Sequence, residues 1–300
     1  MLFNKDGNGS QELYELTGFY YASNHFGGII SELKAATITV KNIVGDNVID
    51  AAKESYYKDC PDLTLVNTVR LPIACLAILN WSKLNIVSHE DSGRKVKIAE
   101  DEKVPFEWMI DRDERELREK YYRALDSLLS YINEDKDKWG TTLFESESII
   151  SGIHELEQVY PIEGSLYSFH LFLPLFVEVQ RTKLSKIINP ASLSDLGHDS
   201  AIHYHARRYV ILEALGIAVR RWSLTVFPLM VARRFAPSYQ GNNEASRVTL
   251  RETTAFLQDL KSDIAEAEHE LKELCAETNN TWNKVVLIPQ NDPRKKFFTC

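Results

Sequence analysis

The sequence has few sulfur-containing residues and no long hydrophobic run. Its 300 residues include 4 Cys and 3 Met. The cysteines form no CxxC motif and stand at no metal-ligand spacing from one another or from a histidine; they are Cys60, Cys75, Cys275 and Cys300. We therefore expect free thiols and a reducing compartment such as a cytoplasm. No run approaches 18 consecutive apolar residues, and the first residues lack an apolar signal core, so we expect neither a membrane protein nor an exported one.

An excess of positive charge is also missing. The chain has 35 Lys and Arg against 43 Asp and Glu, which gives a formal net charge of −8. This balance argues against a molecule that binds polyanions over its whole surface, although local basic patches remain possible. The sequence also lacks a P-loop, a GxGxxG, a GxSxG and an HExxH motif. No residue is therefore nominated for catalysis, and we predict a protein that is not an enzyme and needs no cofactor.

What the sequence does have is helical periodicity. Apolar residues from Ile29 to Val44 follow i, i+4, i+7 spacing, and residues 65–84 form a second apolar segment. Pro105 is suited to the first turn of a long charged helix that runs to about Ile132. These patterns predict a mainly α-helical fold.

The helical pattern returns in the second half of the chain. Three segments repeat in the same order, with matches such as Leu33/Phe169, Val40/Phe176, Ala77/Ala218, Trp81/Trp222, Leu117/Leu260 and Leu128/Leu271. This order suggests duplication of a three-helix module. We predict two tandem modules, over 29–140 and 141–282.

The two ends of the chain differ in character from the modules. Residues 1–28 show no sustained periodicity and are predicted to form an extended arm. The arm carries five aromatic interface candidates: Tyr14, Phe19, Tyr20, Tyr21 and Phe26. Residues 283–300 contain a β-prone run without a partner strand, with four further candidates: Val285, Val286, Leu287 and Ile288. Both ends are expected to bind a neighbouring subunit, and deletion of 1–27 or 284–300 to leave a folded helical protein.

Residues 203–234 form the most basic segment of the chain. Its arginine pairs are Arg207/Arg208, Arg220/Arg221 and Arg233/Arg234, the last two pairs being interface candidates. Their spacing scatters them around a helix instead of forming one basic stripe. Two kinds of partner remain open: carboxylates, including those of the acidic segment 263–277 in the same or a neighbouring subunit, and phosphate groups.

Two patterns resemble metal sites. His203 and His205 would point in nearly opposite directions on a helix, so they could not share a metal ion. Residues 4–15 match part of a calcium loop through Asp6, Asn8, Gly9 and Glu15. The first position is Asn4, and too few residues precede it for an entering helix. We therefore predict that neither pattern binds a metal.

One part of the sequence carries a family resemblance. Residues 67–132, with the preceding 32–52, contain a helix that ends near Gly45, an apolar helix with Leu71, Ala74 and Trp81, and a long charged helix. This pattern resembles the head–tail connector proteins of tailed phages, also called adaptor or head-completion proteins. The likeness is to those of Bacteroides phages in particular, including the ring proteins below the portal of crAss-like phages.

The resemblance implies a structural virion protein at the head–tail junction, assembled in the cytoplasm of a bacterial host. Such a subunit forms a ring, usually dodecameric, that docks under the portal and extends the DNA channel toward the tail. Its partners would be further copies of itself, the portal protein, the next tail or ring component and passing double-stranded DNA. Two alternatives remain: a cytoplasmic helical scaffold or assembly adaptor, and an enzyme that acts on nucleic acid.

Overall fold

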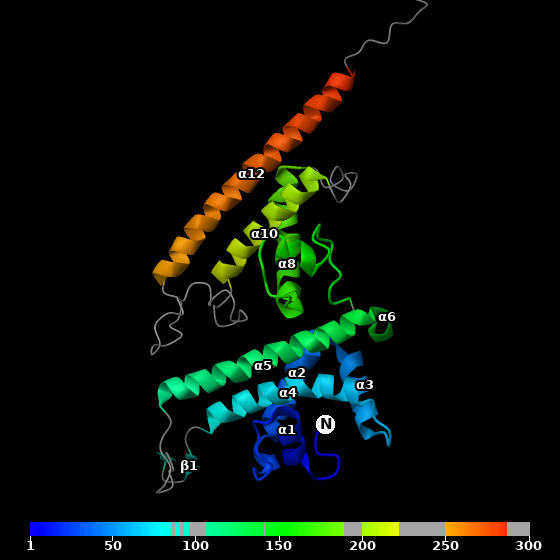
Figure 1. Ribbon diagram of the computed structural model, residues 1–300, viewed down its shortest axis with the longest axis vertical. Helices are drawn as coiled ribbons and strands as arrows, with labels where there is room; N and C mark the ends of the chain where they lie inside the picture. Colours follow the sequence, from blue (N-terminus) through cyan, green and yellow to red (C-terminus); the bar gives the residue numbers. More distant parts are fainter. Residues whose placement is uncertain are drawn as a thin grey trace, which may run out of the picture. The chain divides into compact units, whose positions relative to one another are not determined.

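The computed structural model describes residues 1–85, 88–90, 93–95, 106–140, 142–188, 200–221 and 250–286 (Figure 1). These residues are mainly helical, which confirms the predicted fold class. They form two compact units. Unit 1 contains the described residues of Met1–Glu145 and Ser165–His170; unit 2 contains those of Ser146–Gly164, Leu171–Val226 and Arg247–Cys300.

Unit 1 is built around one central helix, α4. Its elements are α1 (Gly9–Thr17), η1 (Phe26–Gly28), α2 (Ile30–Val44), α3 (Asp46–Tyr57), α4 (Leu63–Leu84), β1 (Ser88–Glu90), β2 (Gly93–Lys95), α5 (Glu107–Glu134) and α6 (Lys136–Trp139). Strands β1 and β2 pair in antiparallel fashion, with Ser88 opposite Lys95. Helix α4 packs against α1, α2, α3 and α5, so apolar residues are buried around most of its circumference.

The sequence of α4 explains both its start and its burial. The Asp62 side chain accepts a hydrogen bond from the Leu65 amide at 3.1 Å, which satisfies one of the free amides of the first turn. The helix continues through Pro72. It is long and apolar enough to cross a membrane, but 61% of its most apolar window is buried inside the protein. We therefore interpret α4 as the core helix of unit 1.

The first 28 residues belong to this core, so the prediction of an extended arm was wrong. Leu2, Phe3, Leu13 and Tyr20 are at most 1% exposed and lie in the same hydrophobic cluster as the buried faces of α2 to α5. The Tyr20 ring meets Trp81 of α4 edge-on, with ring centroids 5.0 Å apart. Unit 1 therefore begins at the first residue, not at residue 29.

Unit 2 is built around α10. Its elements are α7 (Ile153–Glu157), α8 (Leu166–Thr182), η2 (Leu184–Lys186), α10 (Ala201–Arg221) and α12 (Leu250–Val286), and the first residues of α8 belong to unit 1. Helix α10 is buried on nearly all sides from Tyr209 to Val219. Gly216 faces α12, where a Cβ atom at this position would make an ordinary van der Waals contact of 3.5 Å with the Leu260 Cδ2 atom.

Both halves contain three long helices in the predicted order: α2, α4 and α5, then α8, α10 and α12. Matched positions are buried in both, as in Leu33/Phe169, Val40/Phe176, Ala77/Ala218, Leu117/Leu260 and Leu128/Leu271. Helical periodicity alone also places apolar residues inside, so duplication stays a prediction.

Helix α12 runs through Val285 and Val286, so the predicted strand was wrong at these two positions. β-branched residues lower helix stability by only a few tenths of a kcal/mol, roughly, and an established helix readily continues through them. The other two candidates, Leu287 and Ile288, lie outside the described residues.

Candidate functional site

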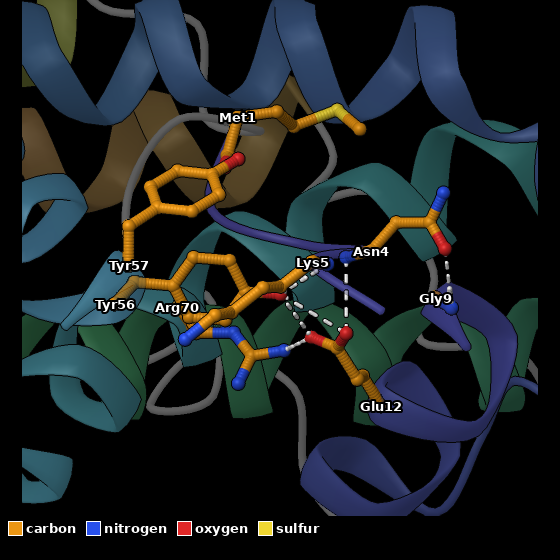
Figure 2. A network of polar contacts seen from close by, with 8 residues as sticks. All are labelled: Met1, Asn4, Lys5, Gly9, Glu12, Tyr56, Tyr57 and Arg70. Carbon is orange, nitrogen blue, oxygen red and sulfur yellow. Dashed lines mark hydrogen bonds and ion pairs between the residues drawn. The ribbon is translucent and has the colours of Figure 1, made fainter. Parts of the chain in front are cut away.

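A buried polar cluster holds the start of the chain in unit 1. Glu12 of α1 forms an ion pair with Arg70 of α4, and their side chains are 19% and 10% exposed. The Tyr56 hydroxyl of α3 donates to Glu12 at 2.9 Å, and the Asn4 amide donates to it at 3.0 Å (Figure 2). We call Asn4, Lys5, Glu12, Tyr56 and Arg70 the Glu12 network. It joins three helices to the first residues of the chain.

The same network fixes the backbone before α1. The Lys5 amide donates to the Tyr56 hydroxyl at 2.8 Å. The Arg70 guanidinium lies over the Phe3 ring, 4.7 Å from its centroid, which combines a cation–π contact with burial of the ring. Burial raises the pKa of Tyr56 well above its usual value, and the hydrogen bond to Glu12 raises it further. Tyr56 is therefore a neutral hydrogen-bond donor at physiological pH.

This geometry also shows what residues 4–15 do. Gly9 to Glu15 lie in α1, and a helix cannot wrap around an ion as a calcium loop does. The Asn4 Oδ1 atom accepts from the Gly9 amide at 2.8 Å, and Glu15 accepts from Gln11 at 2.7 Å. Within the described ranges, no group of three His, Cys, Asp or Glu side chains could hold a metal ion.

Three of the five predicted aromatic residues are exposed on unit 1. Tyr14, Phe19 and Tyr21 are 43%, 41% and 67% exposed, and we call them the N-terminal aromatic surface. The Tyr14 and Tyr21 rings stack with centroids 6.3 Å apart. The Lys120 Nζ atom lies 4.6 Å from the centroid of Phe19 and donates to the Thr17 carbonyl at 2.5 Å.

The other two aromatic candidates are less exposed to solvent. Tyr20 is fully buried, so its prediction as an exposed interface residue was wrong. Phe26 is partly buried, and its ring covers Gly9 so closely that a Cβ atom there would come within 2.4 Å of it. Neighbouring residues of this segment thus divide sharply between the core and the surface.

The arginines of α10 pair mainly with carboxylates inside the chain. Arg207 pairs with Glu155 of α7, where the side chains are 12% and 16% exposed. Arg208 contacts Glu266 at 3.3 Å and Glu270 at 2.6 Å on α12. The acidic segment is therefore a partner of the basic one, as predicted, and for Arg208 the partner lies in the same chain.

The end of α10 is more exposed. Arg221 binds Glu178 of α8 through two hydrogen bonds of 2.6 and 2.7 Å, while the Arg220 Nε atom donates to the Gly216 carbonyl of its own helix. The hydrogen bond from Arg221 lowers the pKa of the Glu178 carboxyl. The remaining arginine candidates, Arg233 and Arg234, lie outside the described residues.

His203 and His205 lie near the start of α10 and have different surroundings. His203 is 5% exposed. The His205 Nδ1 atom lies 3.1 Å from a Glu270 carboxylate oxygen of α12, and the His205 ring meets Tyr204 edge-on. Both residues lie in α10, as the predicted helix start requires.

Sequence reasoning missed Glu12, Arg70 and also Asp126, a third polar anchor in unit 1. Asp126 of α5 accepts from the Ser165 hydroxyl at 3.1 Å and from the Tyr167 amide at 2.9 Å, so it caps the first turn of α8. Burial raises the pKa of its carboxyl even though these hydrogen bonds lower it. Asp126 carries no signal in the sequence because its partners lie on a distant segment.

Comparison with known proteins adds no relative. The sequence matches no family model, and neither a curated protein nor a solved structure matches it. The functional assignment therefore depends on the residues of this chain, their geometry and the resemblance of residues 32–132.

Proposed function

We propose that the protein is a structural subunit that assembles into a ring, and that the ring is a head–tail connector of a tailed phage. The main support for self-assembly is the N-terminal aromatic surface. Tyr14, Phe19 and Tyr21 expose large rings on unit 1, whereas Leu2, Phe3, Leu13 and Tyr20 of the same segment are buried. Exposed aromatic groups of this kind mark protein–protein contacts, where tyrosine is among the residues that contribute most binding energy.

The aromatic surface is held in place before any partner binds. Tyr14 lies on α1, and the Glu12 network attaches this helix to α3 and α4. Lys120 of α5 contacts the Phe19 ring. Because these contacts order the surface in the single subunit, assembly would lose less conformational entropy than binding by a flexible arm.

The helices of unit 1 support the connector assignment. Helix α2 ends at Gly45, which has φ of 88°, and α4 contains Leu71, Ala74 and Trp81. The charged helix α5 follows, from Glu107 to Glu134. These elements correspond in order to the pattern on which the resemblance depends. Partners under this proposal are the portal, the next tail component and the DNA that passes through the ring.

The charge of the chain also supports the proposed role as a connector. Three arginines of α10 are engaged by carboxylates, and the chain has a net charge of −8. A subunit with this balance would let DNA move through a channel without binding it strongly. Identical subunits that contact one another head to tail close into a ring when the rotation between neighbours divides a full turn.

A second candidate function is a cytoplasmic helical adaptor. Phe106, Trp108 and Met109 at the start of α5 are 66%, 54% and 42% exposed. An apolar helix end of this kind can bind in a hydrophobic groove of a partner protein. Under this alternative, the purified protein would remain a monomer until that partner is added.

Electron micrographs of the purified full chain test the proposal. We expect closed rings with a central channel, and we expect Tyr14→Ser with Tyr21→Ser to abolish them. Tyr204→Ser is the matched control, because Tyr204 of α10 is 42% exposed and belongs to the other unit. Single particles without ring closure, at concentrations well above those of a stable complex, would contradict the proposal.

A further inference from the structure

We propose that the N-terminal aromatic surface binds residues 287–300 of a second copy of the chain. This inference rests on the proposed self-assembly and names the contact that produces it. The surface has two chemical features: open aromatic ring faces and an exposed carboxylate, Glu15.

The ring faces come from Tyr14 and Tyr21. Their planes are inclined by only 23°, and both side chains are well exposed. Tyrosine faces carry negative electrostatic potential and attract cations within about 6 Å of the ring centroid. Phe19 illustrates this chemistry in the same surface, since Lys120 occupies one of its faces at 4.6 Å. Neither tyrosine has a cation over its ring within the part of the chain that the structure describes.

The surface also includes an exposed carboxylate. Residues 1–28 contain one lysine, Lys5, and three acids, Asp6, Glu12 and Glu15, and Lys120 of α5 lies over the Phe19 ring. Glu12 is neutralised by Arg70, but Glu15 is exposed, follows Tyr14 in α1 and accepts a hydrogen bond from the uncharged Gln11 side chain. A ligand for this surface should therefore combine positive charge with apolar groups.

Residues 287–300, LIPQNDPRKKFFTC, have this composition. They lie outside the described residues. Arg294, Lys295 and Lys296 against Asp292 give 3 − 1 = +2, in a chain whose net charge is −8. Phe297 and Phe298 follow directly. The three cations match the tyrosine faces and Glu15, and the two phenylalanines can pack edge-on against the exposed rings.

The sequence of this segment contains two prolines, Pro289 and Pro293. Proline as a residue type restricts its own backbone torsion and disfavours a helical conformation in the residue before it. A segment with fewer accessible conformations loses less entropy when it is ordered on a surface. A segment of one subunit that binds the surface of the next also gives the head-to-tail contact that ring closure requires.

A charge exchange tests the pairing. The variants are Glu15→Lys, then Lys295→Glu with Lys296→Glu, then all three together, each measured by sedimentation velocity over a concentration series. We expect each of the first two to raise the midpoint concentration of assembly about tenfold, the order expected for losing one or two exposed cation–π or ionic contacts. The combined variant should recover part of that loss. Glu163→Lys, at an exposed position of unit 2, is the control and should assemble as the wild type does.

A mixing experiment shows which copy supplies the segment. One chain carries Tyr14→Ser and Tyr21→Ser; the other carries Arg294→Glu, Lys295→Glu and Lys296→Glu. Neither should assemble alone, but each mixed pair keeps one intact surface and one intact segment, so two-chain complexes should form. Circular dichroism checks that both chains are folded.

The outcomes separate this inference from the proposed function. If the wild type assembles and every variant assembles equally well, the pairing is overturned and self-assembly stands. If both variants fail alone and the mixture also fails, the segment binds within its own chain, and the contact between copies is overturned. A monomeric wild-type protein would overturn the proposed function and this contact together.

Discussion

The two units place their charged groups differently. In unit 1, the Glu12–Arg70 ion pair lies at a largely buried point where three helices and the first residues of the chain meet. Unit 2 spreads its arginines along α10, from the largely buried Arg207–Glu155 pair to the exposed Arg221–Glu178 pair. The first arrangement makes the start of the chain part of one cooperative core. The second connects neighbouring helices through contacts of graded strength.

The physical reason is desolvation. A buried charge that loses its partner keeps the cost of its removal from water, whereas an exposed charge recovers its hydration. The same chemical pair therefore has very different effects on stability in the two settings.

Deletion of residues 1–27 should unfold unit 1. The deletion removes Leu2, Phe3, Leu13 and Tyr20, all fully buried, and burial of each contributes about 1.5–3 kcal/mol. The sum is comparable with the whole stability of a typical domain, which is about 5–15 kcal/mol. Hydrogen exchange measured by mass spectrometry should show protection lost in α4. Deletion of 287–300 is the control and should leave that protection unchanged. A protected α4 in the 1–27 deletion would restore the original prediction of a separate arm.

Glu12→Ala should lower the free energy of unfolding of unit 1 by about 3–5 kcal/mol, because it leaves the Arg70 guanidinium buried without its counter-ion. Chemical denaturation followed by tryptophan fluorescence measures the change. The double variant Glu12→Leu with Arg70→Met removes both charges and should be less destabilised than Glu12→Ala. A double variant that is as unstable as the single one would show that packing, and not the unpaired charge, determines the loss.

Within unit 2, the cost of removing an arginine should fall along α10. Arg207→Ala should lower the free energy of unfolding by about 3 kcal/mol or more. Arg221→Ala should lower it by under about 1 kcal/mol, because the Arg221–Glu178 pair is solvated. Thermal unfolding at low and high salt measures both. Only the Arg221 contribution should shrink markedly as salt rises. Equal losses in the free energy of unfolding for the two variants would show that the contacts along α10 do not differ in strength.

The sequence predicted the helices well because their apolar residues repeat with helical spacing, as in α2 and α5. It did not predict that residues 1–28 join the core. Leu2, Phe3 and Tyr20 are buried by contact with distant helices, and no local period reveals such contacts. The strand prediction failed at Val285 and Val286 because a local preference for β structure was weaker than continuation of α12.

The candidate site was predicted in part. Tyr14, Phe19 and Tyr21 were recognised as candidates from their aromatic composition alone, but composition could not separate them from Tyr20, whose ring meets Trp81. The carboxylate partners of α10 were inferred from opposite charge, and Arg208 confirms them. Arg70 was missed because an arginine within the apolar sequence of α4 gives no sign of its partner in α1.

The mass of the wild-type protein in solution tests self-assembly most directly. Light scattering on the eluting peak of a size-exclusion column gives this mass without assumptions about shape. We predict one discrete species whose mass is a large whole-number multiple of the 34.4 kDa chain, and we predict that Tyr14→Ser with Tyr21→Ser converts it to a folded monomer. A wild-type protein that elutes at 34.4 kDa at every concentration tested would contradict the account.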